Sequence, residues 1–353
     1  MMVSVETPPL VSVVIPAFNA EATLNEAVAS VLAGTYDKVE IIIVDDSSTD
    51  GTAALAETLV RDHPHVRVHH QANMGLSTAL NRGFALARGD YVARLDADDI
   101  WHPSKLAKQI EMALGEPQLA FIYSWARYID EHGRVSSNGP RQEFPRHALR
   151  RGLYESLVGG GSSALIKRPA IIKAGGCDES FTAFEDLLLQ LKISQSHPIG
   201  FVPEYLVGYR VRPGSLTSDP AKMLREWRRV RKQVKQEFPG VPDQVQAWAH
   251  ARRCTGLAEA FAWRGHKLRS AALLLEAARF DPKWTFLFLR FRIGRRLRKT
   301  TLTPPVPHHP AFFDCNPGEV VAPAMEDDDP SLAKLVDSRN ARLAALDTAA
   351  NRS

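Results

Sequence analysis

The stretch VSVVIPAFN, residues 11–19, is a short apolar run that stops at Pro16 and then turns polar. Such a run is typical of a strand that is buried in a sheet. The apolar residues that follow recur at intervals of three and four, which is the stripe of a helix packed on that sheet. They are Leu24, Ala27, Val28, Val31 and Leu32. The stretch therefore predicts a strand followed by a helix that covers it.

The same alternation continues as far as residue 95. Apolar runs at 39–44, 66–69 and 91–95 predict three more strands, and helical spacing around Leu55 and Leu59 and over 76–87 predicts the helices between them. Alternating strands and helices favour an α/β fold with a mainly parallel central sheet flanked by helices. Ligands of such sheets bind outside the carboxyl ends of the strands.

An acidic cluster, Asp96-Ala97-Asp98-Asp99, directly follows the strand predicted at 91–95. Its carboxylates repel one another, and a hard divalent cation bound to phosphate oxygens would relieve that repulsion, because Mg²⁺ and Mn²⁺ favour oxygen ligands. A solvated acidic turn before a helix opened by Pro103 is the alternative.

A second polar cluster, residues 45–51, follows the strand at 39–44. We expect Ser48, Thr49 or Asp50 to cap the next helix. Capping does not require the adjacent pair Asp45-Asp46, however. A carboxylate there could accept a hydrogen bond from the imide of a nucleotide base, and Phe18 could stack on that base.

Several motifs in register resemble family 2 glycosyltransferases, which are inverting enzymes of the GT-A fold, here of the non-processive bacterial type. The resemblance covers residues 10–218. The matching motifs are Pro16-Ala17-Phe18-Asn19, Val44 to Thr52, Asn73-Met74-Gly75-Leu76-Ser77, Asn81-Arg82-Gly83, Ala87 to Tyr91 and Leu95 to Asp99.

The resemblance implies a donor site for a nucleotide sugar. Asp46 would hold the base with Pro16 and Phe18 beside it, and Gly75 would lie in the loop over the nucleotide. Asp96 and Asp98 would form the DxD pair, which contacts the ribose and the metal, Mn²⁺ or Mg²⁺, on the donor diphosphate.

The pair Glu185-Asp186 matches the place where the family carries its catalytic base, and Asp186 is the matching residue. Taken alone, the pair also fits the first turn of a helix, where acids are favoured by the helix dipole. The chemistry requires a base, because an acceptor hydroxyl must lose its proton as it attacks the anomeric carbon. A single base with direct displacement implies inversion, whereas a hydrolytic glycosidase uses two carboxylates.

The chain departs from the family pattern at several positions. Arg212 stands where many members of the family carry a histidine. An arginine could bind the donor diphosphate through bidentate hydrogen bonds, but it could not ligate a metal. Cys177 and Leu187 replace aromatic residues. The Gln-x-x-Arg-Trp motif of processive polymerising members is absent, which favours the transfer of a single sugar.

The rest of the chain is expected to be accessory to a domain at residues 1–218. The sequence predicts a helical region over residues 219–300 that includes a helical hairpin. It predicts a disordered tail over residues 301–353, with at most a short helix near 331–346. Eight acids and four bases follow residue 300, so residues 301–353 carry a net charge of −4. Because the whole chain carries +4, residues 1–300 carry +8. That basic body suits anionic ligands or an anionic membrane face, and no motif for nucleic acid accompanies it.

The chain has 353 residues and no secretory signal or apolar run long enough to span a membrane, which predicts a cytoplasmic protein. Three separated cysteines predict inert thiols. Residues 284–289 are apolar, and Arg290, Arg292, Arg295, Arg296, Arg298 and Lys299 follow them. We expect peripheral attachment to the inner membrane face through this segment, although a helix packed on the body fits equally well.

The predicted activity is transfer of one sugar to a glycan or lipid-linked acceptor in surface polysaccharide synthesis. Two other readings are weaker. A dehydrogenase or nucleotidyltransferase would need a glycine-rich loop after the first strand, where Pro16 stands. A non-catalytic protein that binds a nucleotide sugar or a partner on the same scaffold is the alternative, and the intact Asp96, Asp98 and Asp186 weigh against it.

Overall fold

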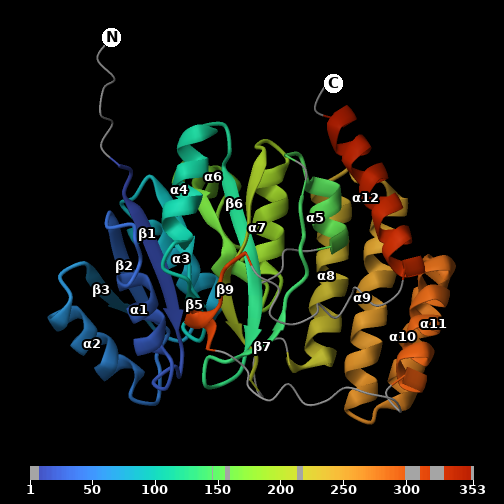
Figure 1. Cartoon of the computed structure of the whole chain (residues 1–353), viewed down its shortest axis with the longest axis horizontal. Coiled ribbons are helices and arrows are strands. Elements are labelled where there is room, and N and C mark those ends of the chain that lie inside the picture. Colours follow the sequence, from blue (N-terminus) through green and yellow to red (C-terminus); the bar gives the residue numbers. More distant parts are fainter. Residues whose placement is uncertain are drawn as a thin grey trace.

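The computed structural model describes residues 8–144, 146–155, 160–212, 218–298, 311–318 and 330–350. Its described strands form one sheet in the order β3-β2-β1-β4-β8-β6-β9-β5, with β7 beside β6 (Figure 1). The strands are β1 (Val11–Ala17), β2 (Val39–Asp45), β3 (Val66–His70), β4 (Tyr91–Arg94), β5 (Ile100–Trp101), β6 (Phe121–Ile129), β7 (Val135–Asn138), β8 (Leu165–Lys167) and β9 (Ile199–Arg210).

The half of the sheet formed by the first four strands is parallel, as the alternation of strands and helices predicts. β1 pairs in parallel with β2 and β4, and β2 pairs in parallel with β3. The other half mixes directions, because β8 runs antiparallel to β4 and β6, whereas β6 and β9 are parallel. The parallel half brings the carboxyl ends of β1, β2 and β4 to one edge.

Helices cover both faces of this sheet. The side chains of β1 alternate between them: Val13 and Ile15 join a core with α1, and Val14 joins a core with α3 on the other face. α3 lies so close to β1 that a Cβ at Gly83 would be 2.2 Å from a Val14 methyl carbon, so only glycine fits there. The helices of this part are α1 (Leu24–Leu32), α2 (Thr52–Asp62), α3 (Leu76–Leu86), α4 (Lys105–Gly115), α5 (Leu149–Glu155), α6 (Arg168–Ala174) and α7 (Glu185–Ser194), with a 3₁₀ turn η1 (Gly160–Ser163).

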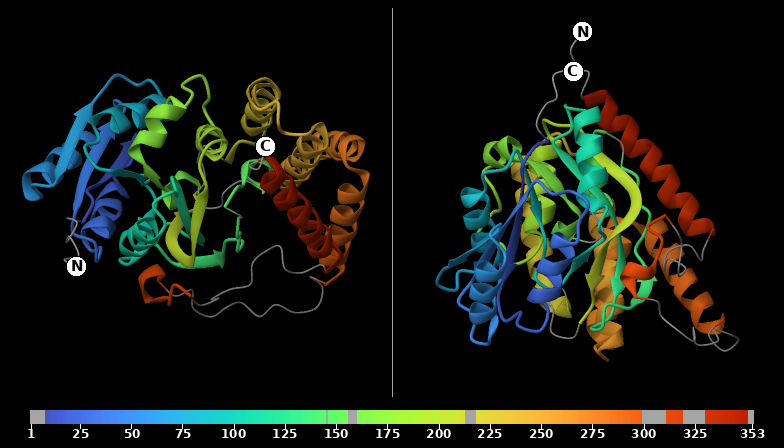
Figure 2. Two further views of the ribbon diagram at one scale, coloured as in Figure 1. Left: turned by 90° about the horizontal axis from the view of Figure 1, so that it is seen from above. Right: turned by 60° about the vertical axis from the view of Figure 1, so that its left-hand side comes forward.

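A helical extension stands beside the sheet (Figure 2). It contains α8 (Pro220–Glu237), α9 (Asp243–Trp263), α10 (Lys267–Phe280) and α11 (Pro282–Arg298), so the predicted helical hairpin is confirmed as α9 and α10. Leu187 and Leu188 of α7 belong to the same apolar core as these helices. The extension is therefore packed directly on the part of the chain that carries α7, and a domain division at residue 218 stays a prediction.

The segment after residue 300 differs from the disordered tail that the sequence predicts. Where it is described, it contains a short 3₁₀ turn η3 (Phe312–Asp314) and a long helix α12 (Pro330–Ala350), which extends the short helix expected near 331–346. Leu343 is fully buried in the core of the extension. Two buried ion pairs add to this contact, Arg339 to Asp281 at 2.5 Å and Arg150 to Asp347 at 2.8 Å. Residues 301–310 and 319–329 lie outside the described residues.

The apolar start of α11 is not available to a membrane in the way that the sequence predicts. Trp284, Leu287 and Phe288 are buried against the body, and Phe286 is the exposed apolar side chain among residues 284–288. The side chains of Arg295, Arg296 and Arg298, and all of Lys299, lie outside the described residues. Among the described residues, no helix has the length and apolar character that crossing a membrane requires.

Candidate active site

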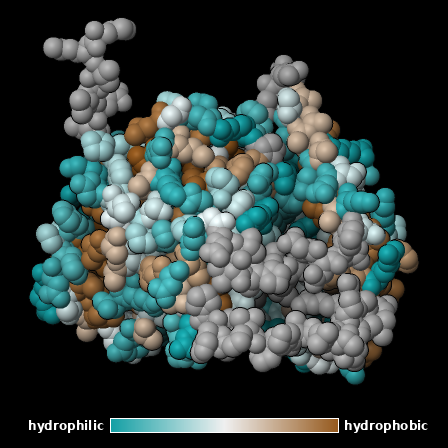
Figure 3. Space-filling model, in the orientation of Figure 1, coloured by the Kyte–Doolittle hydropathy of each residue, from teal (hydrophilic) through white to brown (hydrophobic). Residues whose placement is uncertain are grey.

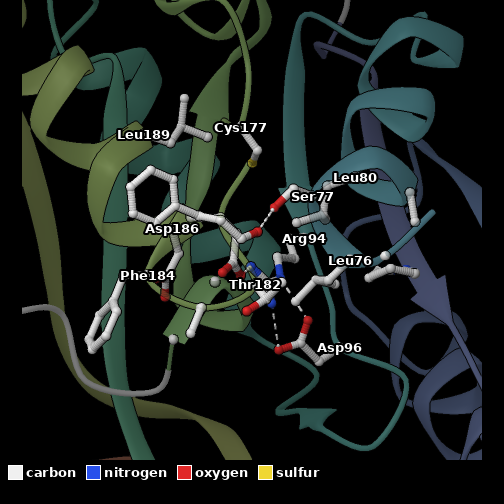
Figure 4. A pocket seen from close by; sticks show the side chains of 18 of the residues that line it. Leu76, Ser77, Leu80, Arg94, Asp96, Cys177, Thr182, Phe184, Asp186 and Leu189 are labelled. Carbon is white, nitrogen blue, oxygen red and sulfur yellow. Dashed lines mark hydrogen bonds and ion pairs between the residues drawn. The ribbon is translucent and has the colours of Figure 1, made fainter. Parts of the chain in front are cut away.

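One cavity of about 980 Å³ opens at the carboxyl ends of β1, β2 and β4. Every residue that the sequence analysis places in a donor site, a metal site or the base position lines it. These residues are Pro16, Phe18, Asp46, Gly75, Asp96, Asp98, Asp186 and Arg212. Figure 4 shows the side chains of Arg94, Asp96 and Asp186 converging on this space. The fold thus brings together segments that are far apart in the sequence.

Asp46, just after β2, holds the loop that precedes α3. Its two carboxylate oxygens accept hydrogen bonds from the Gln71 side chain at 2.8 Å and from the backbone N–H groups of Met74 and Gly75 at 2.9 and 2.8 Å. Gly75 has φ of +89°, a backbone angle that glycine adopts without strain. Phe18 stands half-exposed at the rim of the cavity. Loop and aromatic ring form one wall together.

The neighbouring Asp45 has a different set of contacts. It accepts a hydrogen bond from the Ser48 N–H and lies 3.0 Å from Nδ1 of His70, whose other ring nitrogen is 3.0 Å from Glu57. Hydrogen bonds to these two carboxylates raise the pKa of His70. Of the predicted caps for α2, Asp50 accepts the Thr52 N–H at 3.0 Å, while Gly51 occupies the cap position itself. Asp45 and Asp50 therefore support the local fold.

Arg94, the last residue of β4, lies under the acidic cluster. Its guanidinium makes two hydrogen bonds to Asp96, at 2.6 and 3.0 Å, and a third to Glu185 at 2.8 Å. The Arg94 side chain is only 9% exposed and Glu185 only 5%. Burial raises the pKa of Glu185, and the positive charge of Arg94 opposes that shift. Sequence reasoning missed Arg94, although its place two residues before Asp96 puts both on one side of the extended chain.

Asp98 forms an ion pair with Arg212, and both side chains line the cavity. The Nε atom of Arg212 lies 3.0 Å from a carboxylate oxygen of Asp98. Burial, and then the negative charge of Asp96, raise the pKa of the Asp98 carboxyl, while Arg212 lowers it. Residues 213–217, which continue the family segment after Arg212, lie outside the described residues.

Asp99 points away from the cavity into the protein. It accepts hydrogen bonds from the Ser162 hydroxyl at 2.6 Å and from the Arg210 N–H at 2.9 Å. Complete burial raises its pKa well above the usual range for a carboxyl. Asp99 thus joins the acidic cluster to η1 and β9, and of the three acids only Asp96 and Asp98 line the cavity.

Asp186 lies in the first turn of α7 and lines the cavity between the donor-side carboxylates and the extension. Phe184, the residue before Glu185, has a φ of +67°, which is an unfavourable backbone angle for a bulky residue. Strained backbone angles of this kind are found preferentially at functional sites. A Cβ at Gly160 would lie 3.7 Å from an Asp186 oxygen, so η1 approaches the carboxylate closely. Lys222 of α8 and Arg253 of α9 also line the cavity.

A second group of potential metal ligands lies in the extension, where His250, Cys254 and Glu276 come together. The Trp227 indole N–H points at Nδ1 of His250 at 3.1 Å, and Nε2 lies 3.0 Å from Glu276. Since the indole can only donate, Nδ1 accepts and Nε2 carries the proton that bonds Glu276. Neither ring nitrogen then has a lone pair for a metal, and the group is a buried polar network.

Comparisons with known proteins found a matching family and several relatives. The family model described as glycosyl transferase family 2 matches residues 12–175. An uncharacterized glycosyltransferase of Rickettsia typhi, RT0329, is 30% identical over 224 residues, which cover 62% of this chain and 69% of that protein. A chondroitin synthase of Escherichia coli is 37% identical over 131 residues, 37% of this chain, and the chain spans only 19% of the synthase.

The fold has a match among solved structures. The mannosyltransferase PcManGT of Pyrobaculum calidifontis, solved in complex with GDP-Man and Mn²⁺, superposes with a TM-score of 0.57 and 19% identity. The superposition covers 83% of this chain and 81% of that one. At this level of identity the match concerns the GT-A fold alone.

Proposed function

The chain belongs to glycosyltransferase family 2, and we propose that this glycosyltransferase moves one sugar from a nucleotide-sugar donor to a hydroxyl of a glycan or lipid-linked acceptor, with inversion at the anomeric carbon and with the help of a divalent cation. The observation that supports the proposal most is that Asp46, Asp96, Asp98 and Asp186 line one cavity. We place the donor beside Asp46, Asp96 and Asp98, and the acceptor beside Asp186 and the helical extension.

The donor end would hold the nucleotide. Phe18 offers an aromatic face for the base, and the loop fixed by Asp46 would lie over the nucleotide at Gly75. Asp46 keeps acceptor capacity for a base N–H, because each carboxylate oxygen can accept two hydrogen bonds. Arg212 would bind the diphosphate, a role that its planar guanidinium fits.

The donor set fits a divalent cation. Asp96 and Asp98 line the cavity and offer hard oxygen ligands. Burial, and then the negative charge of Asp96, raise the pKa of Asp98, and a bound cation would offset both effects. Mn²⁺ or Mg²⁺ held by these two residues would stabilise the charge that develops on the leaving diphosphate. The Mn²⁺ in the mannosyltransferase PcManGT supports this part of the proposal.

Asp186 would act as the base that takes the proton from the acceptor hydroxyl. Its place in the first turn of α7, with Gly160 beside it, exposes the carboxylate to the cavity. Cys177 also lines the cavity, but burial raises its pKa to about 12, so it would stay a thiol and would not compete as nucleophile or base. Direct attack by the acceptor then gives the inverted product.

The acceptor end would be built by the extension. Lys222 and Arg253 line it, and the Arg253 guanidinium stacks on Phe184 and Trp227 at 5.0 and 5.2 Å. Cations beside the base suit an acceptor that carries negative charge. A relative named as a chondroitin synthase supports a role in the synthesis of a polysaccharide.

We further propose that the enzyme works at the surface of an anionic membrane. The contact would be made by the α10 face, which we define as Leu268 and Leu275, with exposed fractions of 88 and 71%. α10 and α11 lie at the end of the molecule away from β3, where apolar and hydrophilic side chains stand side by side (Figures 1 and 3). This face replaces the apolar start of α11 that the sequence suggested.

The charges around the α10 face favour lipid over a second copy of the chain. Residues 263–292 contain seven bases and two acids. Both acids pair with bases outside this segment, Glu276 with Arg228 and Asp281 with Arg339, and one of the seven bases, Arg292, lies 3.9 Å from Glu259. Two such faces would repel each other, whereas each base near an anionic leaflet contributes about 1 kcal/mol of binding free energy. Exposed apolar side chains would enter the interface.

A panel of nucleotide sugars tests the catalytic proposal. Thermal unfolding with each donor in Mn²⁺ identifies the donor, because a bound ligand stabilises the folded state by mass action. Release of nucleoside diphosphate from that donor, followed without acceptor and with Mn²⁺ or EDTA, then measures turnover. We expect one donor to raise the unfolding temperature and to be hydrolysed slowly only with the cation. Stabilisation without hydrolysis under any condition would point to a binding protein.

A further inference from the structure

The cavity contains a buried cation whose position the donor, metal and base assignments do not explain. Arg94 lies between carboxylates from two distant parts of the chain, Asp96 just after β4 and Glu185 at the start of α7. Burial alone would lower the pKa of Arg94, but the charges of Asp96 and Glu185, and then that of Asp186, raise it above its ordinary value. Figure 4 shows Arg94 beside Asp96 with Asp186 nearby.

The surrounding backbone is shaped to hold this side chain in place. A Cβ at Gly161 would lie 2.3 Å from Cδ of Arg94, so a residue other than glycine at position 161 would displace the Arg94 side chain. The hydroxyl of Ser162 accepts the Asp96 N–H at 3.0 Å, which fixes the carboxylate that Arg94 binds. Because the fork of a guanidinium can reach two carboxylates at fixed angles, lysine would not reproduce the contact.

We propose that Arg94 is a resident counter-cation that joins the donor carboxylate Asp96 to the helix of the base, and that it competes with the divalent cation for Asp96. The inference rests on the proposed function, since it takes Asp96 as a cation ligand. Three acids, Asp96, Glu185 and Asp186, surround the single guanidinium of Arg94. Arg94 thereby keeps α7 in line with the donor site before the donor arrives, and acts as a positioning residue.

The competition predicts opposite changes in metal affinity for two substitutions. Arg94→Met removes the competing charge, so we expect the protein to bind Mn²⁺ alone at least three-fold more tightly than the wild type. Glu185→Gln leaves Arg94 wholly to Asp96, so we expect Mn²⁺ binding at least two-fold weaker. Arg94→Lys keeps the charge and should bind Mn²⁺ within two-fold of the wild type. Titration calorimetry or the spin-resonance signal of free Mn²⁺ measures each value without substrate.

Turnover should move differently from metal affinity. Arg94→Met and Glu185→Gln both release α7 from the donor site, so we expect acceptor-free donor hydrolysis to fall at least ten-fold in each, with Arg94→Lys in between. The unfolding temperature of each variant with and without Mn²⁺ reports whether it is folded. A purely structural Arg94 predicts lower stability and an unchanged or weaker affinity for Mn²⁺.

The outcomes separate the inference from the proposed function. A folded Arg94→Met protein that binds Mn²⁺ no more tightly than the wild type overturns the role of Arg94 and leaves the metal site standing. A wild-type protein that binds no Mn²⁺ overturns the metal site and the competition with it. Where Arg94→Met does not fold, a Glu185→Gln protein whose Mn²⁺ affinity is unchanged or stronger overturns the inference on its own.

Discussion

Single carboxylates in the cavity differ in their hydrogen-bond and ion-pair partners. Asp46 is tied to backbone N–H groups, Asp96 to Arg94 and Asp98 to Arg212, so substitutions of similar size should affect different steps. A partly exposed carboxylate such as Asp98 contributes little to the core. Changes at this scale should therefore alter binding or turnover and leave the fold intact.

Asp98→Asn should remove most of the cation-dependent turnover and weaken donor binding, because an amide is a poorer ligand for a hard cation than a carboxylate. The unfolding temperature without ligands should stay close to that of the wild type. Donor hydrolysis over a range of Mn²⁺ concentrations measures the effect. Asp62→Asn, an exposed carboxylate at the end of α2, is the matched control. Near-normal activity of Asp98→Asn in Mn²⁺ would refute the DxD assignment.

Asp186→Asn keeps the shape of the side chain but cannot accept a proton, and loss of a general base lowers the rate by roughly 10²–10⁴-fold. Donor affinity should hardly change, because Asp186 would contact the acceptor. The test compares the Kd of the donor with kcat for transfer in the wild type and the variant. If donor affinity and turnover collapsed together, Asp186 would be a binding or structural residue.

At the scale of the single element, the proposed membrane contact depends on α10. α10 turns Ser270, Leu273 and Ala277 inward, so Leu268 and Leu275, seven residues apart, share its outer side. Two turns of helix separate them, about 10 Å along the axis. Leu268 and Leu275 are 88 and 71% exposed, so both side chains could enter a lipid interface.

Liposome flotation tests the α10 face. We expect the wild type to float with vesicles of phosphatidylcholine and phosphatidylglycerol, and less so in high salt or with phosphatidylcholine alone. Leu268→Ser with Leu275→Ser should abolish most of the binding. Ile172→Ser on α6, which removes an equally exposed apolar side chain elsewhere, is the matched control. Equal flotation of the double variant and the wild type, or no flotation of either, would exclude this surface.

The sequence predicted the elements that follow local rules. Asp46, Asp96 and Asp98 could be placed in one site because each follows a strand, and strands that alternate with helices end at one edge. The bond from Arg94 to Glu185 joins residues 91 positions apart, and no local pattern announces it. The burial of Trp284 could be given only as one of two equal alternatives for a related reason, because α11 is apolar all round at its start and only packing decides which side faces water.

At the scale of the whole molecule, stability should depend on His250, which links three helices of the extension. Burial, and then the charge of Arg231, lower its pKa to about 4, while the ordinary value is 6.5. The unfolded chain therefore takes up a proton below pH 6.5 that the folded protein does not take up until about pH 4. The free energy of unfolding therefore falls as the pH is lowered from 6.5 toward 4, and it is regained when the pH is raised above 6.5.

Urea unfolding between pH 7.5 and 4.5 measures this dependence. We expect the unfolding midpoint of the wild type to fall more steeply over this range than that of His250→Asn, which carries no proton-binding group there. The variant will be less stable at pH 7.5, since the bonds to Trp227 and Glu276 are lost. Parallel slopes for the two proteins would show that other groups govern the acid response.

The position of α12 late in the sequence affects how the protein folds while it is being synthesised. Ribosomes deliver the chain from its amino end, and folding generally starts before synthesis is complete. Arg150 of α5 and Asp281 before α11 emerge long before Asp347 and Arg339, the α12 residues that neutralise them. A buried charge without its partner is costly, so a nascent chain cannot close this part of the extension. α5 ends at Glu155, which lines the cavity, and the wall there is therefore finished after translation has passed α12.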